Sequence, residues 1–319
     1  LALQGWVRNT AEGVEIAVWG GEAEVAQFVD RLCGHAPTQS QIGTIRRQVF
    51  ERPKPGDFTI TASREGAETL NTVEVLPDIA TCASCLGDMR DESSRYHQYP
   101  FTNCTECGPR FSIIARAPYD RANTAMAGFE MCRDCQADFD RPQNRRFHAQ
   151  SIACGDCGPR VWLEEWRTGT RDAGNEAGDA IGRAVDAILG GSIVAIKGLG
   201  GFHLACDATQ EDAVIELRKR KRRPDKPLAL MVRDLEIVRR YCRMSGAEEL
   251  LLTGPEAPIV LLTKKGNSNL AGAVAPGLCE VGLMLPNTPL HHLLMERFDV
   301  PVVMTSGNPS GQPQATDNE

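Results

Sequence analysis

The sequence reads CTECGPR at residues 104–110 and, fifty residues later, CGDCGPR at residues 154–160. Each copy holds the second of two CxxC motifs. Eight of the twelve cysteines lie in such motifs: Cys82, Cys85, Cys104, Cys107, Cys132, Cys135, Cys154 and Cys157. Two CxxC turns about fifteen to twenty residues apart can supply the four thiolates of a tetrahedral Zn²⁺ site. The spacing therefore predicts a duplicated module with two structural zinc ions.

The repeat extends upstream of the cysteines, where Arg95-Tyr96-His97 resembles Arg146-Phe147-His148. The ligands can pair locally, with one ion in each repeat, or interleave, with one ion between the outer motifs and one between the inner motifs. Eighteen residues separate the two motifs of each repeat, which favours local pairing. Four thiolates complete a site, so we expect His97 and His148 to pack or to lie at the surface. Disulfides and a redox CxxC are the alternatives to zinc.

Composition limits the classes of protein and partner. A chain of 319 residues with 42% hydrophobic and 24% charged residues is globular and multidomain, and it has no apolar run long enough for a membrane span. A net charge of −7 argues against a nucleic-acid partner. Reduced cysteines predict a cytoplasmic location. We expect the four cysteines outside the motifs to be small buried hydrophobes: Cys33, Cys206, Cys242 and Cys279.

Neither end has the pattern of a natural terminus, because the chain starts within a strand-like alternation and stops soon after a glycine-rich turn. We therefore expect a fragment of a longer polypeptide, with both end domains truncated. The changes in pattern predict an α+β and α/β multidomain protein with domains at residues 1–75, 76–170 and 178–319.

The N-terminal domain shows an α+β pattern. Leu3–Asn9 and Val14–Trp19 alternate with period two around a turn at residues 11–13, which predicts a hairpin. A helix is predicted from Glu22 to Cys33, ended by Gly34. Two further strands are predicted at Ile42–Phe50 and Phe58–Ile60.

Gly5-Trp6-Val7-Arg8-Asn9 and the following turn resemble the acylphosphatases, a ferredoxin-like family that hydrolyses carboxyl-phosphate anhydrides. The resemblance implies that Asn9 orients the attacking water. It also implies a phosphate-binding loop with an arginine, which would precede Leu1 in the chain. The alternative is that Asn9 serves only the tight turn.

The C-terminal domain begins with a helix predicted at Ile181–Leu189 and a buried strand at Ser192–Ile196. The strand leads into the glycine-rich segment Lys197–Leu204. There Gly200 and Gly201 permit close backbone approach to a phosphate, and Lys197 can neutralise its charge. The segment matches neither a P-loop nor a dinucleotide fingerprint.

A run of six basic residues, Arg218–Arg223, follows a helix predicted from Thr209 and precedes a continuous strand predicted at Leu228–Val232. Such a run can supply cations to a triphosphate. It can also be a solvated helix end or a nonspecific nucleic-acid patch. Later strands are predicted at residues 258–262, 281–286 and 302–306.

These landmarks, in this order, resemble the YrdC/Sua5 twisted-sheet fold, whose members form acyl-adenylates from ATP. The resemblance assigns Lys221 and Arg223 to a KxRP element, and Ser306 and Asn308 to an SxN element that faces the nucleotide. A threonylcarbamoyl-adenylate synthase has a threonine-rich segment where this chain has residues 197–204, which favours a smaller acid. Lys197 and His203 are expected near that acid.

The order of the modules resembles that of the HypF-type carbamoyltransferases of [NiFe] hydrogenase maturation. The resemblance implies hydrolysis of carbamoyl phosphate, passage of the carbamate to the YrdC-like site, and its reaction with ATP and Mg²⁺ to form carbamoyl-adenylate. The carbamoyl group then goes to the C-terminal cysteine of a HypE-type acceptor, a step that we expect this fragment not to complete. Two other functions fit parts of the sequence: a threonylcarbamoyl-adenylate synthase for tRNA modification, and a non-enzymatic zinc-ribbon adaptor for RNA or protein.

Overall fold

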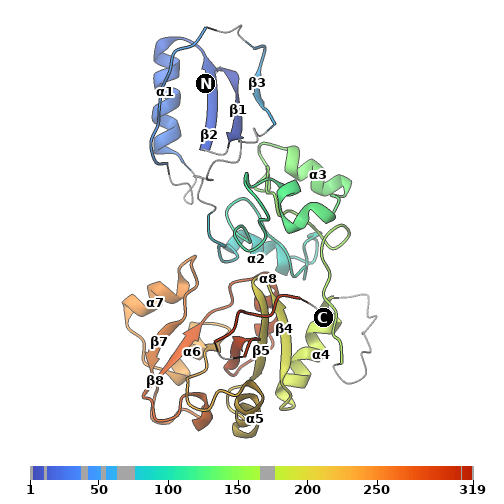
Figure 1. Ribbon diagram of the computed structural model, residues 1–319, viewed down its shortest axis with the longest axis vertical. Helices are drawn as coiled ribbons and strands as arrows, with labels where there is room; N and C mark the ends of the chain where they lie inside the picture. Colours follow the sequence, from blue (N-terminus) through green and yellow to red (C-terminus); the bar gives the residue numbers. More distant parts are fainter. Residues whose placement is uncertain are drawn as a thin grey trace. The chain divides into compact units, whose positions relative to one another are not determined.

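The computed structural model describes residues 3–10, 13–36, 42–51, 55–62, 76–165, 177–309 and 311–317. Its chain divides into two compact units, which are described separately. The first unit is Leu1–Pro77 with Ile113–Gly128, and the second is Asp78–Ser112 with Phe129–Glu319 (Figure 1).

The first unit holds a three-stranded sheet in the order β2-β1-β3 and one long helix. β1 (Gln4–Thr10) pairs antiparallel with β2 (Gly13–Trp19) and parallel with β3 (Phe58–Ile60). The helix α1 (Glu22–Gly34) follows β2. The predicted hairpin, helix and short strand are confirmed, while residues 11 and 12 of the expected turn lie outside the described residues. Two single turns, η1 (Arg121–Asn123) and η2 (Ala125–Gly128), also belong to this unit.

The strand predicted at Ile42–Phe50 is wrong, because residues 42–50 form no strand or helix. The sheet of this unit contains only β2, β1 and β3 among the described residues. The end of the segment is held instead by a ring contact. Phe50 meets Trp19 edge-on, with 5.0 Å between the ring centroids.

The second unit begins with two zinc-type repeats, which we call the first repeat (residues 78–112) and the second repeat (residues 129–165). Each has a short helix that starts directly after its first cysteine: α2 (Ala83–Arg90) after Cys82 and α3 (Arg133–Asp140) after Cys132. Each of these cysteines occupies the N-cap position of its helix, and the Cys132 sulfur accepts a hydrogen bond from Cys135 N–H.

The backbone fixes the register of the duplication at fifty residues throughout. Gln98 and His148 both have a positive φ, of 51° and 53°, and both donate their N–H to the end of the preceding helix. Arg95 therefore corresponds to Arg145. The predicted match of Arg95-Tyr96-His97 to Arg146-Phe147-His148 is wrong by one residue, because two adjacent arginines make the sequence pattern ambiguous.

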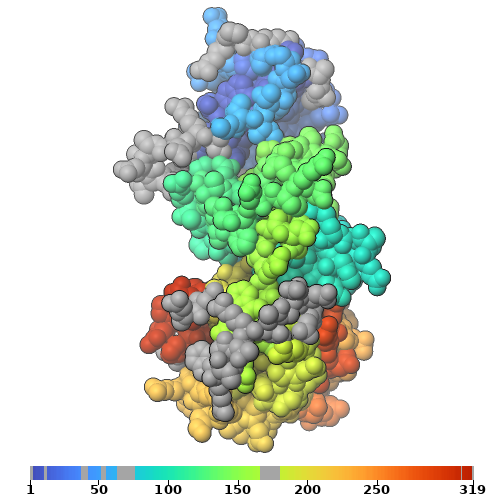
Figure 2. Space-filling view, turned by 90° about the vertical axis from the view of Figure 1, so that its right-hand side faces the viewer, coloured from blue at the N-terminus to red at the C-terminus, as the bar shows by residue number. Residues whose placement is uncertain are grey.

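The sheet domain has six strands in the order β4-β5-β9-β6-β8-β7, and only β6 and β8 run parallel. Their bounds are β4 (Val194–Gly198), β5 (Gly201–Asp207), β6 (Leu230–Met231), β7 (Val260–Thr263), β8 (Glu280–Met284) and β9 (Val302–Ser306). The twisted mixed sheet agrees with the expected fold class. In Figure 2 the yellow and amber residues of this domain's first half lie in the lower part of the view, and red residues lie on both sides of the domain.

Helices enclose a separate apolar core on each face of this sheet. One core contains side chains of α4 (Ala177–Leu189) and α8 (Pro289–Met295). The other core contains side chains of α5 (Glu211–Lys221), α6 (Leu235–Tyr241), α7 (Gly246–Thr253) and η3 (Gly272–Val274). Because both faces are covered, polar side chains that serve a ligand are expected at the ends of the strands.

The predicted strand at residues 228–232 is shorter than expected and contains only Leu230 and Met231. Its flanks remain bonded, since Leu228 N–H donates to Val274 O and Val232 N–H donates to Met284 O. No helix of the described chain is long and apolar enough to cross a membrane.

The prediction for the four remaining cysteines is half correct. Cys206 and Cys242 are buried, but Cys33 and Cys279 are exposed. Cys33 lies on α1, whose residues are all at least partly accessible, and Cys279 directly precedes β8.

Candidate functional site

The eight motif cysteines form two clusters, one within each repeat. Cys82, Cys85, Cys104 and Cys107 form the first, and Cys132, Cys135, Cys154 and Cys157 the second, with every sulfur of a cluster within 4.8 Å of the others. Local pairing is thereby confirmed. His97 is exposed and His148 packs against Phe139 and Phe147, and neither belongs to a cluster.

The spacing of the sulfurs fits zinc. Neighbouring sulfurs lie 3.5–3.9 Å apart in both clusters. A tetrahedron with Zn–S bonds of about 2.3 Å has edges of about 3.8 Å. Four thiolates leave no open ligand position, so each cluster suits a structural ion.

Each cluster also receives an arginine from the other repeat. Arg145 Nη1 donates to Cys85 Sγ at 3.0 Å, and Arg95 Nη1 donates to Cys135 Sγ at 3.0 Å. Ion pairs with Asp88 and Asp138 hold the two guanidinium groups. These arginines were not among the predicted site residues, although their fifty-residue spacing was a usable signal.

The first repeat is hydrogen-bonded to two loops of the sheet domain, one after α7 and one before α8. Thr81, next to the ligand Cys82, donates its N–H to Asn287 O at 3.0 Å. Ala80 N–H donates to Pro255 O at 2.9 Å. The zinc-type repeat and the sheet domain are therefore joined by main-chain bonds.

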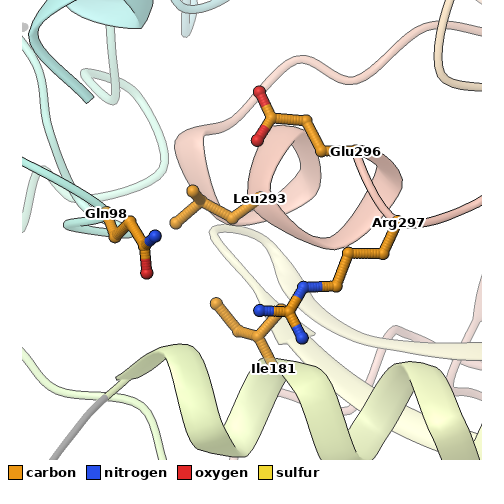
Figure 3. Close-up of a pocket in the computed structure, with 5 residues that line it drawn as sticks. All are labelled: Gln98, Ile181, Leu293, Glu296 and Arg297. Carbon is orange, nitrogen blue, oxygen red and sulfur yellow. The ribbon is translucent and has the colours of Figure 1, made fainter. Parts of the chain in front are cut away.

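A small pocket lies beside this junction, between the first repeat and helices α4 and α8. Figure 3 shows Leu293 directed toward Gln98, and the Arg297 guanidinium beside Ile181. A Cβ at Gly182 would lie 2.5 Å from Arg297 Nη1, so the absence of a side chain at Gly182 lets the Arg297 guanidinium pack against α4. None of the predicted site residues lines this pocket.

In the sheet domain, Lys221 and the turn after β9 come together. The side chain of Lys221 is 5% exposed. Its Nζ donates to Ser306 O and, at 2.8 Å, to Asn308 O. Burial, and then the charge of Arg223, lowers the pKa of Lys221. The structure thus places the end of the basic run against the SxN turn, as the sequence predicts.

Arg218 has a structural role that its place in the basic run did not reveal. It is 8% exposed and donates to main-chain carbonyls on both sides of the basic loop. Its acceptors are Ala273 O, Val274 O, Arg223 O, Pro224 O and Lys226 O. The expectation that the whole basic run requires an anion or solvent is therefore wrong for Arg218 and Lys221, whose charges are met by carbonyl dipoles.

Arg223 is half-buried and folds back on its own loop. It donates to Lys226 O at 3.2 Å and to Pro227 O at 2.6 Å. It lines a basic hollow with residues of α5 and the loop, namely Ile215, Arg218, Lys219, Arg222 and Pro224. Burial lowers the pKa of Arg223.

The glycine-rich segment is a tight hairpin between β4 and β5, so His203 lies within a strand. His203 pairs in register with Ser306 on β9. Burial lowers its pKa, and its Nδ1 is buried without a hydrogen-bond partner among the described residues. A Cβ at Gly198 would meet the imidazole at 3.1 Å, so the glycine makes room for the ring.

Lys197 and the two central glycines occupy the hairpin end. The Lys197 ammonium lies 5.5 Å from the centroid of the Phe202 ring. Gly200 is exposed and Gly201 has φ of 129°. Phe202 N–H donates to Ala315 O, so the C-terminal segment runs beside this hairpin.

The turn after β9 is shaped by Asn308, which donates to Pro309 O at 2.9 Å and to Gln312 O at 2.5 Å. Its Oδ1 is buried without a partner among the described residues. His203 Nδ1 and Asn308 Oδ1 are thus two buried polar atoms near the β5–β9 ladder that have no partner among the described residues.

A buried histidine pair was missed by the sequence reading. His291 on α8 is 4% exposed, and its ring lies 5.9 Å from that of His203. Its Nδ1 lies 2.7 Å from Asn287 Oδ1. Burial, followed by the charges of His203 and His292, lowers the pKa of His291 to about 3. The signal available was the four-residue spacing of Asn287 and His291 at a helix start.

In the first unit, Asn9 lies at the exposed end of β1 and pairs in register with Val14. The preceding Arg8 is paired with Glu15 at 2.7 Å, and its guanidinium lies 4.7 Å from the Trp6 ring. Asn9 is thus exposed to solvent, and the neighbouring Arg8 forms an ion pair with Glu15.

Family models match the chain in three parts. The acylphosphatase model matches residues 1–60, the HypF finger model matches residues 81–114 and 131–164, and the Sua5/YciO/YrdC model, described as telomere recombination, matches residues 186–319.

Relatives match the chain as a whole. Carbamoyltransferase HypF of Rhodobacter capsulatus is 50% identical over 99% of this chain and 41% of its own length. The crystal structure of full-length HypF in the phosphate- and nucleotide-bound form superimposes with a TM-score of 0.90 and 45% identity, over 99% of this chain and 40% of that one. By contrast, human threonylcarbamoyl-AMP synthase is 30% identical over only 42% of this chain. The chain thus spans about two fifths of the length of the HypF proteins that it matches, and it belongs to the HypF family of carbamoyltransferases.

Proposed function

We propose that the sheet domain activates carbamate as carbamoyl-adenylate, within the carbamoyltransferase reaction that matures [NiFe] hydrogenases. The observation that supports this most directly is the Lys221 ammonium bound to Ser306 O and Asn308 O. It brings a cationic helix end against the turn that resembles a nucleotide-binding element.

The proposed step is a displacement at the α-phosphorus of ATP. A carbamate oxygen forms a bond to phosphorus, and the bond from phosphorus to the pyrophosphate oxygen breaks, with its electron pair leaving on pyrophosphate. Arg223 stabilises the negative charge on the phosphates, and Lys221 holds the turn that carries Ser306 and Asn308. Ser306 and Asn308 orient the nucleotide, and Mg²⁺ accompanies ATP as part of the substrate.

The hairpin end is proposed to receive the carbamate. Gly200 and Gly201 allow the acid to approach the backbone, and Lys197 supplies a positive charge. His203 is neutral at pH 7, because its pKa is lowered, and can accept a hydrogen bond. A neutral acceptor suits the carbamate amino group better than a second cation would.

Carbamate is proposed to arise from carbamoyl phosphate at the acylphosphatase-like unit. Water oriented by Asn9 adds to phosphorus, and the bond to the carbamoyl oxygen breaks to give phosphate and carbamate. The two zinc-type repeats serve as a scaffold, within the proposed domain division at residues 1–75, 76–170 and 178–319. The acceptor of the carbamoyl group is proposed to be the C-terminal cysteine of a HypE-type protein.

The test is exchange of labelled pyrophosphate into ATP in the presence of carbamoyl phosphate. We expect exchange in the full-length wild-type protein, and a loss of at least about 100-fold in its Arg223→Ala and Lys221→Met variants. Arg220→Ala is the matched control, because Arg220 belongs to the same basic run but is exposed and paired with Glu216. Loss of exchange in the control, or full exchange in Arg223→Ala, would contradict the assignment.

The partial similarity to threonylcarbamoyl-AMP synthase supplies a second candidate. Exchange that requires threonine and bicarbonate, and ignores carbamoyl phosphate, would favour it. Salt-sensitive RNA binding without any exchange would favour a zinc-ribbon adaptor.

A further inference from the structure

The two cysteine clusters are connected by a reciprocal exchange of arginines. The first cluster receives Arg145 from the second repeat, and the second cluster receives Arg95 from the first repeat. The distance from Nη1 to Sγ is 3.0 Å in both contacts. Each cluster therefore has one sulfur whose hydrogen-bond donor comes from the other repeat.

Each guanidinium is held by at least two groups of the repeat that it reaches into. Arg145 contacts both Cys85 and Asp88, and it also donates to Ser84 O at 3.2 Å. Arg95 contacts both Cys135 and Asp138. Since the carboxylates lie one helical turn after the cysteines, each arginine is fixed over the sulfur and not merely near it.

Further bonds join the same surfaces. Thr105 of the first repeat donates its hydroxyl to Arg145 O at 2.9 Å, and Asn103 and Ser151 exchange two hydrogen bonds. The loop that carries Arg145 is therefore ordered by both repeats together.

The chemistry of a four-thiolate zinc site makes these donors important. Four thiolates and one Zn²⁺ carry a net negative charge, and a charged donor to sulfur stabilises the metal-bound thiolate. Small zinc modules generally fold only when the metal binds. A donor that belongs to the other repeat is in place only when that other repeat is folded around its own ion.

We propose that Arg95 and Arg145 couple the two sites, so that binding of one zinc ion favours binding of the second. The one-zinc protein then lacks a positioned donor at its occupied site and is poorly populated. This coupling concerns only the repeats and is independent of the adenylation chemistry.

Native mass spectrometry during stepwise zinc addition to the metal-free protein tests the coupling directly. Independent sites of equal affinity would place about half of the molecules in the one-zinc state at half loading. We expect that state to be several-fold rarer in the wild type, with metal-free and two-zinc protein dominant. A one-zinc fraction of about half would overturn the proposal without any variant being needed.

A mutant cycle identifies the route of the coupling. Chelator competition should show that Cys132→Ser with Cys135→Ser weakens zinc binding at the first cluster by about 10-fold, and that Arg145→Ala does the same. Combining these changes should add little, because both remove the same contact.

Arg133→Ala is the matched control. Arg133 lies next to the ligand Cys132 and is exposed, and its side chain makes no sulfur contact within the described residues. We expect it to leave zinc binding within about 2-fold, and Arg145→Lys to retain part of the coupling. An unchanged first cluster after loss of the second would refute the proposal.

Discussion

Removal of zinc should unfold the two repeats while the sheet domain stays folded. Outside the cysteines, the large hydrophobic side chains that the repeats bury are Met89, Tyr96, Tyr99 and Ile152. At about 1.5–3 kcal/mol each, their burial supplies about 6–12 kcal/mol. One structural zinc ion contributes about 10–16 kcal/mol. Each ion therefore stabilises the repeats as much as their entire set of large buried side chains.

Hydrogen exchange read by mass spectrometry can locate the effect. After treatment with EDTA, we expect residues 78–112 and 129–165 to exchange at nearly the rate of an unfolded chain. Strands β5 and β9 should keep their slow exchange, because the apolar cores on both faces of the sheet contain no predicted metal ligand. EDTA saturated beforehand with zinc is the control. Slow exchange that persists in the repeats after complete loss of metal would refute the reasoning.

Three further predictions concern the sheet domain. Arg218→Met should destabilise it by about 3 kcal/mol, because several carbonyls lose a charged donor, and should lower its Tm by about 6–12 °C in calorimetry, whereas the exposed Arg220→Met should change it little. Stability should fall by about 2 kcal/mol between pH 7 and pH 5 through His291, since its folded pKa of about 3 lies below the ordinary value of 6.5 and the unfolded chain takes up the proton first; His291→Leu should remove this part of the slope in urea titrations. Gly201→Ala should cost about 1–3 kcal/mol and speed hydrogen exchange in residues 311–317, because φ is 129° and the new Cβ would lie 2.5 Å from Ala315 O; unchanged exchange there would contradict it.

The sequence predicted what depends on spacing and period. The two clusters of four cysteines followed from CxxC spacing, and the resemblance to the YrdC/Sua5 fold had assigned Lys221 and Ser306, which are in contact, to one site. The strand at Phe58–Ile60 and the helix predicted at Glu22–Cys33 followed from short-range pattern. In each case the deciding interaction lies between neighbours in sequence or between members of one motif.

What the sequence missed depends on partners far along the chain. Residues 42–50 have the composition of a strand, but they pair with none of the three strands of the sheet. Within the basic run, the sequence does not distinguish Arg218 and Lys221 from their neighbours Lys219 and Arg220. Only in the folded protein do the side chains of Arg218 and Lys221 donate hydrogen bonds to main-chain carbonyls. The His203–His291 pair joins a strand to a helix more than eighty residues away, which no local pattern reveals.

The exchange of arginines between the repeats has the form of a twofold interface within a single chain. Residue and partner change places: Arg95 serves Cys135 as Arg145 serves Cys85. Such mutual contacts are typical of homodimers. A polypeptide with a single repeat would have a cysteine sulfur without its arginine donor and an arginine without its sulfur acceptor on the same surface. Two such polypeptides could form both hydrogen bonds with each other. The duplication therefore has the architecture of a fused dimer. Because the linker joins the two repeats, their association is intramolecular.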